Sequence, residues 1–346
     1  ADLEPNHVII QLKNQIGTHS IAFNHQTHGT AGHIIHTISD ICPRFFTQEG
    51  DFIITDHHEM IGRRPDSFAL INPKNPDDCY PFAEITGVGV AFKLACALLK
   101  LVEKNPEVKK ISDKLNLPML PGWEKWLLDL VAIGTVADCH SLLGENRVLV
   151  KYGLKVLAKT RWPGLKAVCQ AAGLDFSLRL PDAYTLGFVL APRLNAAGRL
   201  EHANIALDAL LETEPMAAQS KAERLNSINQ RRQEITEQIL SEAREQAVKI
   251  SSRKILLIYG NNWPKGVVGL VAGRIVEEFN RPTFVLAEEA GQLTGSGRSV
   301  GGFNLVEALN HAAGFLDKYG GHKEAAGLTL KSGNREGFYE TLLTYA

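Results

Sequence analysis

Short apolar runs alternate with segments of helical periodicity along the first two thirds of the chain. Strands are expected at 19–23, 51–55 and 68–71. Helices are expected at 30–39, 88–102, 126–136 and 147–157, where apolar residues recur at helical spacing. Because strands alternate with helices, this part of the sequence predicts an α/β domain with a largely parallel sheet.

The last third of the chain resumes the same alternation after one long charged helix. Apolar positions over residues 217–248 recur close to a 3.6-residue period, which predicts a helix connecting two domains. Strands are then expected at 254–259 and 283–287, with a helix at 268–279. The predicted organisation is a first α/β domain at 1–212, a connecting helix at 213–250 and a second α/β domain at 251–346.

Composition narrows the class of protein. A chain of 346 residues with 45% hydrophobic and 22% charged residues is expected to be soluble and globular. It has no apolar run of about 18 residues and no signal peptide, which predicts a cytoplasmic protein that does not enter membranes. Five cysteines without C-x-x-C spacing indicate reduced thiols. A net charge of −1 means that a polyanion would have to be bound in a local basic groove.

Asp56, His57 and His58 form the most informative cluster, because they directly follow the strand expected at 51–55. Ligands of α/β sheets bind at strand ends. One carboxylate and two imidazoles suit Mn²⁺, Fe²⁺ or Zn²⁺ better than Ca²⁺. Adjacent histidines also cap strands or bond to backbone carbonyls. The tripeptide alone therefore leaves both interpretations open.

Several motifs occur in the order found in one known family. The first five are Ile54-Thr55-Asp56-His57-His58, Ile71-Asn72-Pro73, Gly87-Val88-Gly89-Val90-Ala91, Gly134-Thr135-Val136-Ala137-Asp138 and Gly144-Glu145-Asn146-Arg147. They resemble the DHH phosphoesterase superfamily, and Pro192-Arg193-Leu194-Asn195-Ala196-Ala197-Gly198-Arg199 resembles its RecJ branch. Three later segments resemble the companion DHHA1 domain of this family: Gly266-Val267-Val268-Gly269, Gly297-Arg298-Ser299 and Gly320-Gly321-His322.

The resemblance implies an exonuclease that removes nucleotides from the 5′ end of single-stranded DNA in repair and recombination. It implies two Mn²⁺ or Mg²⁺ sites, since two metal ions can activate water and neutralise the phosphorane. The metal and catalytic residues that it implies are Asp56, His57, His58 and Asp138, with Asp138 at a second strand end. Turn chemistry offers an alternative, in which Asp138 caps the turn before Ser141.

The resemblance also implies residues that contact the DNA strand. They are Arg193, Asn195, Arg199, Arg298, Ser299, Gly320, Gly321 and His322. Arg193 and Arg199 flank a segment of small residues, which is interpreted as a loop that lets both guanidiniums contact a phosphate, with Asn195 positioning that loop or the substrate. An ion pair with Glu201 is the alternative. The glycines at 295, 297, 320 and 321 permit positive φ and close approach of amides to an anion, although a tight hairpin would use glycine equally well. Trp263, Phe303 and Tyr319 are expected in the core or at its rim rather than as stacking platforms for bases.

The amino-terminal loop departs from the family pattern. Where the family carries D-x-D-x-D-G, this chain reads Asn24-His25-Gln26-Thr27-His28-Gly29, which leaves His28 as a candidate metal ligand. Three functions stay open: an exonuclease, an impaired relative that binds single-stranded DNA or a replication partner, and a phosphoesterase for small nucleotides or pyrophosphate. The long connector argues against the third. The expected partner is single-stranded DNA, and single-strand-binding or other repair proteins are candidate partners.

Overall fold

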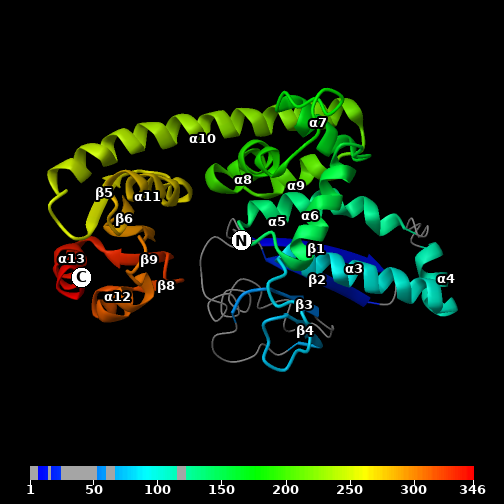
Figure 1. The fold of residues 1–346 in the computed structure, drawn as a ribbon, viewed down its shortest axis with the longest axis horizontal. Helices are drawn as coiled ribbons and strands as arrows, with labels where there is room; N and C mark the ends of the chain where they lie inside the picture. The colour runs from blue at the N-terminus through cyan, green and yellow to red at the C-terminus, as the bar shows by residue number, and fades with distance from the viewer. Residues whose placement is uncertain (1–6, 15–16, 25–52, 60–66, 115–121) are drawn as a thin grey trace. The chain divides into compact units, whose positions relative to one another are not determined.

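The computed structural model describes residues 7–14, 17–24, 53–59, 67–114 and 122–346 (Figure 1). These residues belong to two compact units. Of the described residues, the second unit holds 196–202 and 227–346, and the first unit holds the rest. The helix expected at 30–39 and the loop that contains His28 lie outside the described residues.

A four-stranded sheet organises the first unit. Its strands are β1 (His7–Asn14), β2 (Gly17–Asn24), β3 (Ile53–Thr55) and β4 (Ala69–Ile71). They lie in the order β1-β2-β3-β4. The pairs β2–β3 and β3–β4 are parallel, whereas β1 pairs antiparallel with β2. The largely parallel sheet is therefore confirmed, and β1 is an additional strand that was not predicted although it contains the apolar run Val8-Ile9-Ile10.

Helices follow these strands up to the boundary between the units. They are α3 (Gly87–Lys104), α4 (Pro106–Lys114), η1 (Trp123–Leu127), α5 (Leu128–Ala137), α6 (Gly144–Leu157), α7 (Pro163–Ala171), the π-helix η2 (Thr185–Leu190), α8 (Ala191–Leu200) and α9 (Asn204–Leu211). Helices α3 and α5 approach closely, because a Cβ atom on Gly134 would lie 2.8 Å from Val88 Cγ1. Around this contact Ile85, Val90 and Val131 are buried together.

The predicted long helix is confirmed as α10 (Pro215–Lys249), which contributes to both units. Its first turns bury Ala218, Ala222 and Leu225. Its later turns place Leu240 and Ala243 in a core cluster of the second unit. The helix is continuous over 35 residues (Figure 1).

A five-stranded sheet organises the second unit. Its strands are β5 (Leu256–Asn261), β6 (Thr283–Glu289), β7 (Gln292–Arg298), β8 (Lys318–Gly321) and β9 (Ala325–Lys331). They lie in the order β5-β6-β7-β9-β8, with β5–β6 parallel and the other pairs antiparallel. The remaining helices are α11 (Lys265–Phe279), α12 (Leu305–His311), α13 (Arg335–Tyr345) and the short η3 (Ala313–Phe315) and η4 (Ser332–Asn334).

Both faces of this sheet are covered, because alternate residues of β5 and β6 point to opposite sides. Leu256 and Ile258 pack with α10 and α11. Ile255 and Leu257 pack with α12 and α13. Figure 1 shows α11 and α12 on opposite sides of the sheet. The mixed α/β fold expected for the second domain is confirmed.

The glycines at 295 and 297 serve a different purpose from the one predicted. They lie within β7 in extended conformation, and of the four glycines singled out only Gly321 has a positive φ, +145°. A Cβ atom on Gly295 would lie 2.0 Å from Val285 O, and one on Gly297 would lie 2.7 Å from Phe284 Cε1. Glycine is required at these two positions for close packing against β6.

Within the described part of the chain, no helix is both long and apolar enough to span a membrane.

Candidate metal centre and arginine cluster

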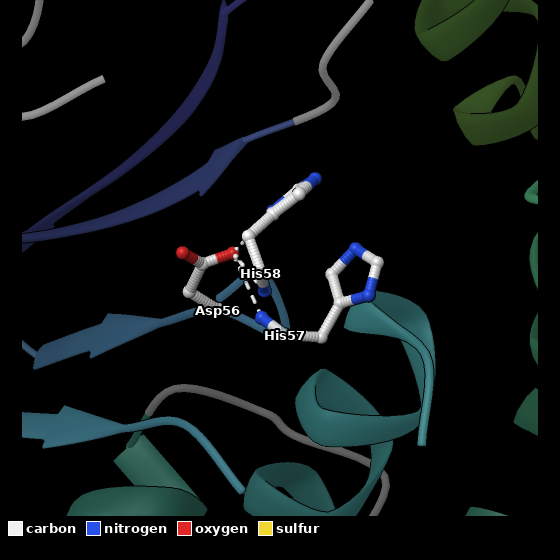
Figure 2. Close-up of side chains that lie close together, drawn as sticks. All are labelled: Asp56, His57 and His58. Atoms are coloured by element: carbon white, nitrogen blue, oxygen red, sulfur yellow. Dashed lines mark hydrogen bonds and ion pairs between the residues drawn. The ribbon is translucent and has the colours of Figure 1, made fainter. Parts of the chain in front are cut away.

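The Asp56-His57-His58 tripeptide begins where β3 ends. The Asp56 N–H donates to Ile71 O at 3.0 Å, which continues the pairing with β4 by one residue. Asp56 Oδ1 accepts from the His57 N–H at 2.7 Å and lies 2.7 Å from His58 Nδ1 (Figure 2). Burial raises the pKa of Asp56, but the hydrogen bond and charge of His58 and two backbone N–H groups outweigh it and hold this pKa below its usual value. The Asp56 carboxylate is thus occupied in holding this turn.

His58 is tied to Asp56. The hydrogen bond that His58 donates to Asp56 raises the pKa of His58 above its ordinary value, against the opposing effect of burial. Asn72, at the end of β4, donates from Nδ2 to His58 O at 2.9 Å. The Ile71-Asn72-Pro73 motif therefore fixes the backbone at His58, and His58 Nδ1 is engaged by a carboxylate.

His57 has a different environment, because its ring is turned away from the Asp56 carboxylate (Figure 2). The ring packs against the first residue of α3, where a Cβ atom on Gly87 would lie 3.0 Å from His57 Cδ2. Burial, followed by the charge of His58, lowers the pKa of His57 to about 3. Its Nδ1 atom is buried without a hydrogen-bond partner in the described structure. The imidazole is therefore neutral at neutral pH and offers a lone pair.

Asp138 faces this imidazole from the end of a helix, not from the second strand end that was expected. It is the C-cap of α5, and its N–H donates to Gly134 O at 3.0 Å. Asp138 Oδ2 lies 3.6 Å from His57 Nε2. The close packing of α3 on α5 brings the two side chains together, which explains the glycines of the motifs around positions 87 and 134.

His140 lies beside the same carboxylate and was not singled out from the sequence. Its Nε2 atom is 3.7 Å from Asp138 Oδ2, and its ring centroid is 5.4 Å from that of His57. One potential ligand atom from each of these three residues lies within 4.8 Å of the other two. Asp56, His57 and His58 form a second such group. Two imidazoles and a carboxylate form a donor set that suits Mn²⁺, Fe²⁺ and Zn²⁺.

The second unit carries a cluster of arginines, which comprises Arg199, Arg232, Arg274 and Arg298. Burial and then the charge of Arg232 lower the pKa of Arg199. Burial and then the charge of Arg274 lower the pKa of Arg232, and burial and then the charge of Arg199 lower the pKa of Arg298. Since guanidinium groups keep their protons in proteins, these shifts describe crowded cations that an anion would stabilise.

Neutral groups hold the guanidiniums of this arginine cluster in place. Arg199 Nη1 donates to Gly266 O at 2.9 Å, and Arg232 Nη2 donates to Asn229 Oδ1 at 2.7 Å. Arg298 Nη1 donates to Ser296 Oγ at 2.5 Å. Arg232 Nε is buried without a hydrogen-bond partner in the described structure. The cluster therefore has donor capacity to spare for an anion.

Two glycines of the Gly266-Val267-Val268-Gly269 motif make room for these arginines. A Cβ atom on Gly266 would lie 2.2 Å from Arg199 O. A Cβ atom on Gly269 would lie 3.1 Å from Arg298 Nη2. The start of α11 therefore needs glycine so that the end of α8 and the Arg298 side chain can approach it.

Arg193 and Asn195 lie on α8 in the first unit, so the predicted loop between the two arginines of this motif is wrong. Arg193 Nε donates to Asn226 Oδ1 at 3.0 Å, and its Nη1 donates to Val189 O at 2.7 Å. Six residues on a helix span about 600°, so Arg193 and Arg199 point to different faces. They do not form one fork on a shared phosphate. The small residues of this motif suggested a loop, but small residues such as Ala196 also favour a helix.

The serine that hydrogen-bonds to Arg298 is Ser296, which was not singled out from the sequence. Ser299 Oγ donates to Phe303 O at 2.7 Å within its own loop. Gly320 and Gly321 lie in β8, which pairs antiparallel with β9. His322 follows them and is exposed, with its N–H donating to Ala325 O at 2.8 Å. The hairpin alternative for these glycines is therefore present in the structure.

An exposed pair of stacked rings lies on the helical segment that precedes α8. Tyr184 and Phe188 are 64% and 71% exposed, and their ring centroids are 4.9 Å apart at an interplanar angle of 22°. Between them, a Cβ atom on Gly187 would lie 3.3 Å from Val136 Cγ1, two residues before Asp138. In contrast, Trp263 is buried in a core cluster, as expected. Their i, i+4 spacing is one at which side chains of a helix share a face, but no helix was predicted from the sequence at this position.

This chain is similar to known proteins of one family. Residues 248–346 match the DHHA1 domain family, so the second unit is of the DHHA1 class. The chain is 40% identical over 285 residues to the single-stranded-DNA-specific exonuclease RecJ of Bacillus subtilis, which covers 82% of this chain and 33% of that protein. With the RecJ of Salmonella typhimurium it shares 39% identity over 302 residues, which is 83% of this chain and 50% of that protein. The chain therefore spans between a third and a half of the length of these curated relatives.

Solved structures lead to the same family. The crystal structure of exonuclease RecJ bound to manganese matches with a TM-score of 0.67 and 32% identity, over 90% of this chain and 72% of that chain. RecJ from Thermus thermophilus in complex with Mn²⁺ matches with a TM-score of 0.71 and 32% identity, over 90% of this chain and 42% of that chain. The chain belongs to the RecJ family. The resemblance seen in its motifs and the expected α/β fold class are thereby confirmed.

Proposed function

We propose that this chain forms the catalytic part of a metal-dependent exonuclease that hydrolyses single-stranded DNA in the 5′ to 3′ direction during repair and recombination. The observation that carries the proposal is the meeting of His57 and Asp138. A neutral, buried imidazole from a strand end lies 3.6 Å from a carboxylate at a helix end, in a chain of the RecJ family. This is an arrangement in which a divalent cation would satisfy both groups.

His57 and Asp138 are proposed to hold Mn²⁺ or Mg²⁺. In this proposal Asp56 and His58 orient the turn, either as further ligands or through the hydrogen bond between them. A bound metal would supply deprotonated water near neutral pH and would neutralise charge on the phosphorane. His28 remains a proposed ligand that lies outside the described residues. RecJ of Thermus thermophilus has been crystallised with Mn²⁺ and with Mg²⁺, which supports both choices.

The phosphates of the strand are proposed to bind the arginine cluster of the second unit. The crowded, partly buried guanidiniums of Arg199, Arg232 and Arg298, with spare donors, favour a polyanion. Arg199 and Arg298 are the leading contacts, and Ser296 joins them because of its bond to Arg298. The remaining proposed contacts from the sequence are Arg193, Asn195, Ser299, Gly320, Gly321 and His322. The exposed rings of Tyr184 and Phe188 would allow bases to stack.

Three further expectations belong to this proposal. Single-strand-binding and other repair proteins are proposed partners, and the cytoplasm is the proposed location, because the relatives are named for activity on DNA. The division into 1–212, 213–250 and 251–346 is proposed as the domain organisation, supported by the extent of α10 and by the DHHA1 match at 248–346.

Digestion of single-stranded DNA tests the function directly. One oligonucleotide is labelled at the 5′ end and another at the 3′ end, and each is incubated with the protein and Mn²⁺, with and without EDTA, while metal content is measured. The expected result is Mn²⁺-dependent release of the 5′ label as mononucleotide. If DNA is bound but neither label is released and no metal is held, the chain is a noncatalytic relative and the proposal is wrong.

A further inference from the structure

We infer that His140 is a third metal ligand, which completes a site of two imidazoles and one carboxylate with His57 and Asp138. This inference rests on the proposed metal-dependent function, and it deepens that function by identifying a ligand and the metals that this ligand set prefers. His140 belongs to no motif on which the family resemblance depends. It enters solely through its position in the structure.

The distances suit a shared cation. With metal–nitrogen bonds of about 2.0–2.1 Å, neighbouring ligand atoms lie about 3.4 Å apart in a tetrahedral site. Asp138 Oδ2 is 3.6 Å from His57 Nε2 and 3.7 Å from His140 Nε2. These separations are too long for direct hydrogen bonds and close to the spacing that a common metal imposes. Small side-chain rotations would bring all three atoms to bonding distance.

The backbone directs His140 to this position. Cys139 has φ of +55°, which is uncommon for a residue with a side chain, and this left-handed residue reverses the chain immediately after α5. The turn returns His140 to the side of Asp138. Downstream, the buried Asn146 donates from Nδ2 to Ser141 O at 3.1 Å and to Glu84 O at 2.7 Å. The segment that carries His140 is therefore held at both ends.

The surroundings of His57, Asp138 and His140 favour a bound cation over two imidazoles without a metal. The three side chains meet at the C-terminal end of α5, where the helix dipole attracts positive charge. The His57 side chain is 13% exposed and that of His140 is 17% exposed, so water solvates neither ring well. A bound metal would give both Nε2 atoms a partner at bonding distance.

The ligand set also predicts which metals bind. Mg²⁺ prefers oxygen ligands, whereas Co²⁺, Zn²⁺ and Fe²⁺ bind well to imidazole nitrogen. Mn²⁺ accepts both oxygen and nitrogen ligands. In the amino-terminal loop, where the family pattern has three aspartates, this chain has Asn24, Gln26 and His28. The His140 imidazole therefore adds a nitrogen ligand to the site of a chain that has fewer carboxylates than the family pattern. We expect Co²⁺ and Mn²⁺ to bind much more tightly than Mg²⁺.

Cobalt binding tests the ligand without depending on activity. The full chain is titrated with Co²⁺ by calorimetry, and the paramagnetically shifted imidazole N–H signals of the loaded protein are counted by proton NMR. Wild type should bind one Co²⁺ at this site with two shifted N–H signals. His140→Ala should weaken binding at least about 100-fold, above the typical loss for an outer-shell partner, and should lose one signal.

Three further variants separate the possible outcomes. His311→Ala removes an exposed imidazole of the second unit and should change neither result. His140→Asp should restore Mn²⁺ binding with weaker Co²⁺ binding, because it replaces nitrogen by oxygen. If His140→Ala binds Co²⁺ as wild type does while His57→Ala does not, His140 is not a ligand and the proposed function stands. If wild type binds no Co²⁺, or His57→Ala binds it unchanged, the proposed metal centre fails as well.

Discussion

The imidazole–carboxylate cluster of the first unit and the arginine cluster of the second are assembled from the chain in different ways. His57 and Asp138 lie at the ends of secondary-structure elements, and short motifs place them there. The arginine cluster draws on residues 199, 232, 274 and 298, from three helices and a strand. Short local motifs can therefore place a group of potential metal ligands, whereas a cluster of cations is assembled by the packing of elements that are distant in the sequence.

Substituting His57, a proposed metal ligand, should have the largest effect and should distinguish the roles proposed for the two clusters. We expect His57→Ala to lower Mn²⁺-dependent DNA cleavage by about 10³-fold, because a metal supplies several kcal/mol of transition-state stabilisation. Affinity for single-stranded DNA should change little, since the arginine cluster is untouched. Label-release kinetics and fluorescence anisotropy measure the two effects, and circular dichroism checks the fold. Full cleavage by this variant would remove His57 from the metal centre.

Protonation of His57 and of His58 should change the stability of the first unit with opposite signs. The folded pKa of His57, about 3, lies below its unfolded value, so the unfolded chain binds the proton first and stability falls as pH decreases below 6.5. Between pH 6.5 and 4 this amounts to about 3 kcal/mol. The raised pKa of His58 acts in reverse, since its contribution is complete below 6.5 and is lost as pH rises through the folded pKa.

Urea denaturation of the metal-free protein from pH 4 to 8 measures this effect. His57→Gln should flatten the decline in unfolding free energy on the acid side. His58→Gln should remove a stabilising contribution that is largest at low pH. Identical pH profiles for the two variants would show that the rings do not occupy the contrasting environments described above.

Substituting an arginine of the arginine cluster should weaken DNA binding and leave metal binding unchanged, which is the opposite of the result expected for His57→Ala. We expect Arg298→Ala to weaken binding of single-stranded DNA about tenfold, since it removes a charged contact, and to reduce the salt slope by about 0.7. Metal binding should be unchanged. Arg335→Ala is the matched control, because Arg335 lies in the same unit but pairs with Glu336. An unaltered salt dependence in Arg298→Ala would identify a structural arginine.

The smallest effect tests the glycines that make room for the arginine cluster. Gly269→Ala would place a methyl group 3.1 Å from Arg298 Nη2, and we expect it to weaken DNA binding a few-fold by displacing the guanidinium. Gly273 lies on the same helix with nothing within 4 Å of its would-be Cβ. Gly273→Ala should therefore raise stability by about 0.5–1 kcal/mol without changing DNA affinity. Equal DNA affinities for the two variants would contradict the proposed role of Gly269.

The sequence was informative where structure is local. Periodicity predicted α3, α10, α11 and the strands that precede Asp56 and Asn72, because burial on one face leaves a repeating pattern. The Asp56-His57-His58 cluster was also evident, since it directly follows a strand. The sequence did not show that the two histidines of the tripeptide have different environments. His58 is tied to Asp56 while His57 turns away, and this depends on the approach of α3.

Other features depend on contacts that periodicity does not encode. His140 was missed because its importance depends on a left-handed turn at Cys139, a conformation with no sequence signature at a cysteine. Arg232 was missed because it lies on a long charged helix whose other polar residues resemble it. The motif around Arg193 was interpreted as a loop, although its small residues pack within α8. In each case the tertiary partner decides the outcome.

Helix α10 has a practical consequence for dissecting this protein. Its 35 residues extend for about 50 Å, and buried side chains along it belong to the cores of both units. A cut within 215–249 would expose Leu225 on one fragment or Leu240 on the other, both of which are buried in the intact chain. Fragments divided there should be prone to aggregate. Producing either unit as a separate protein would therefore require that it keep the whole of α10.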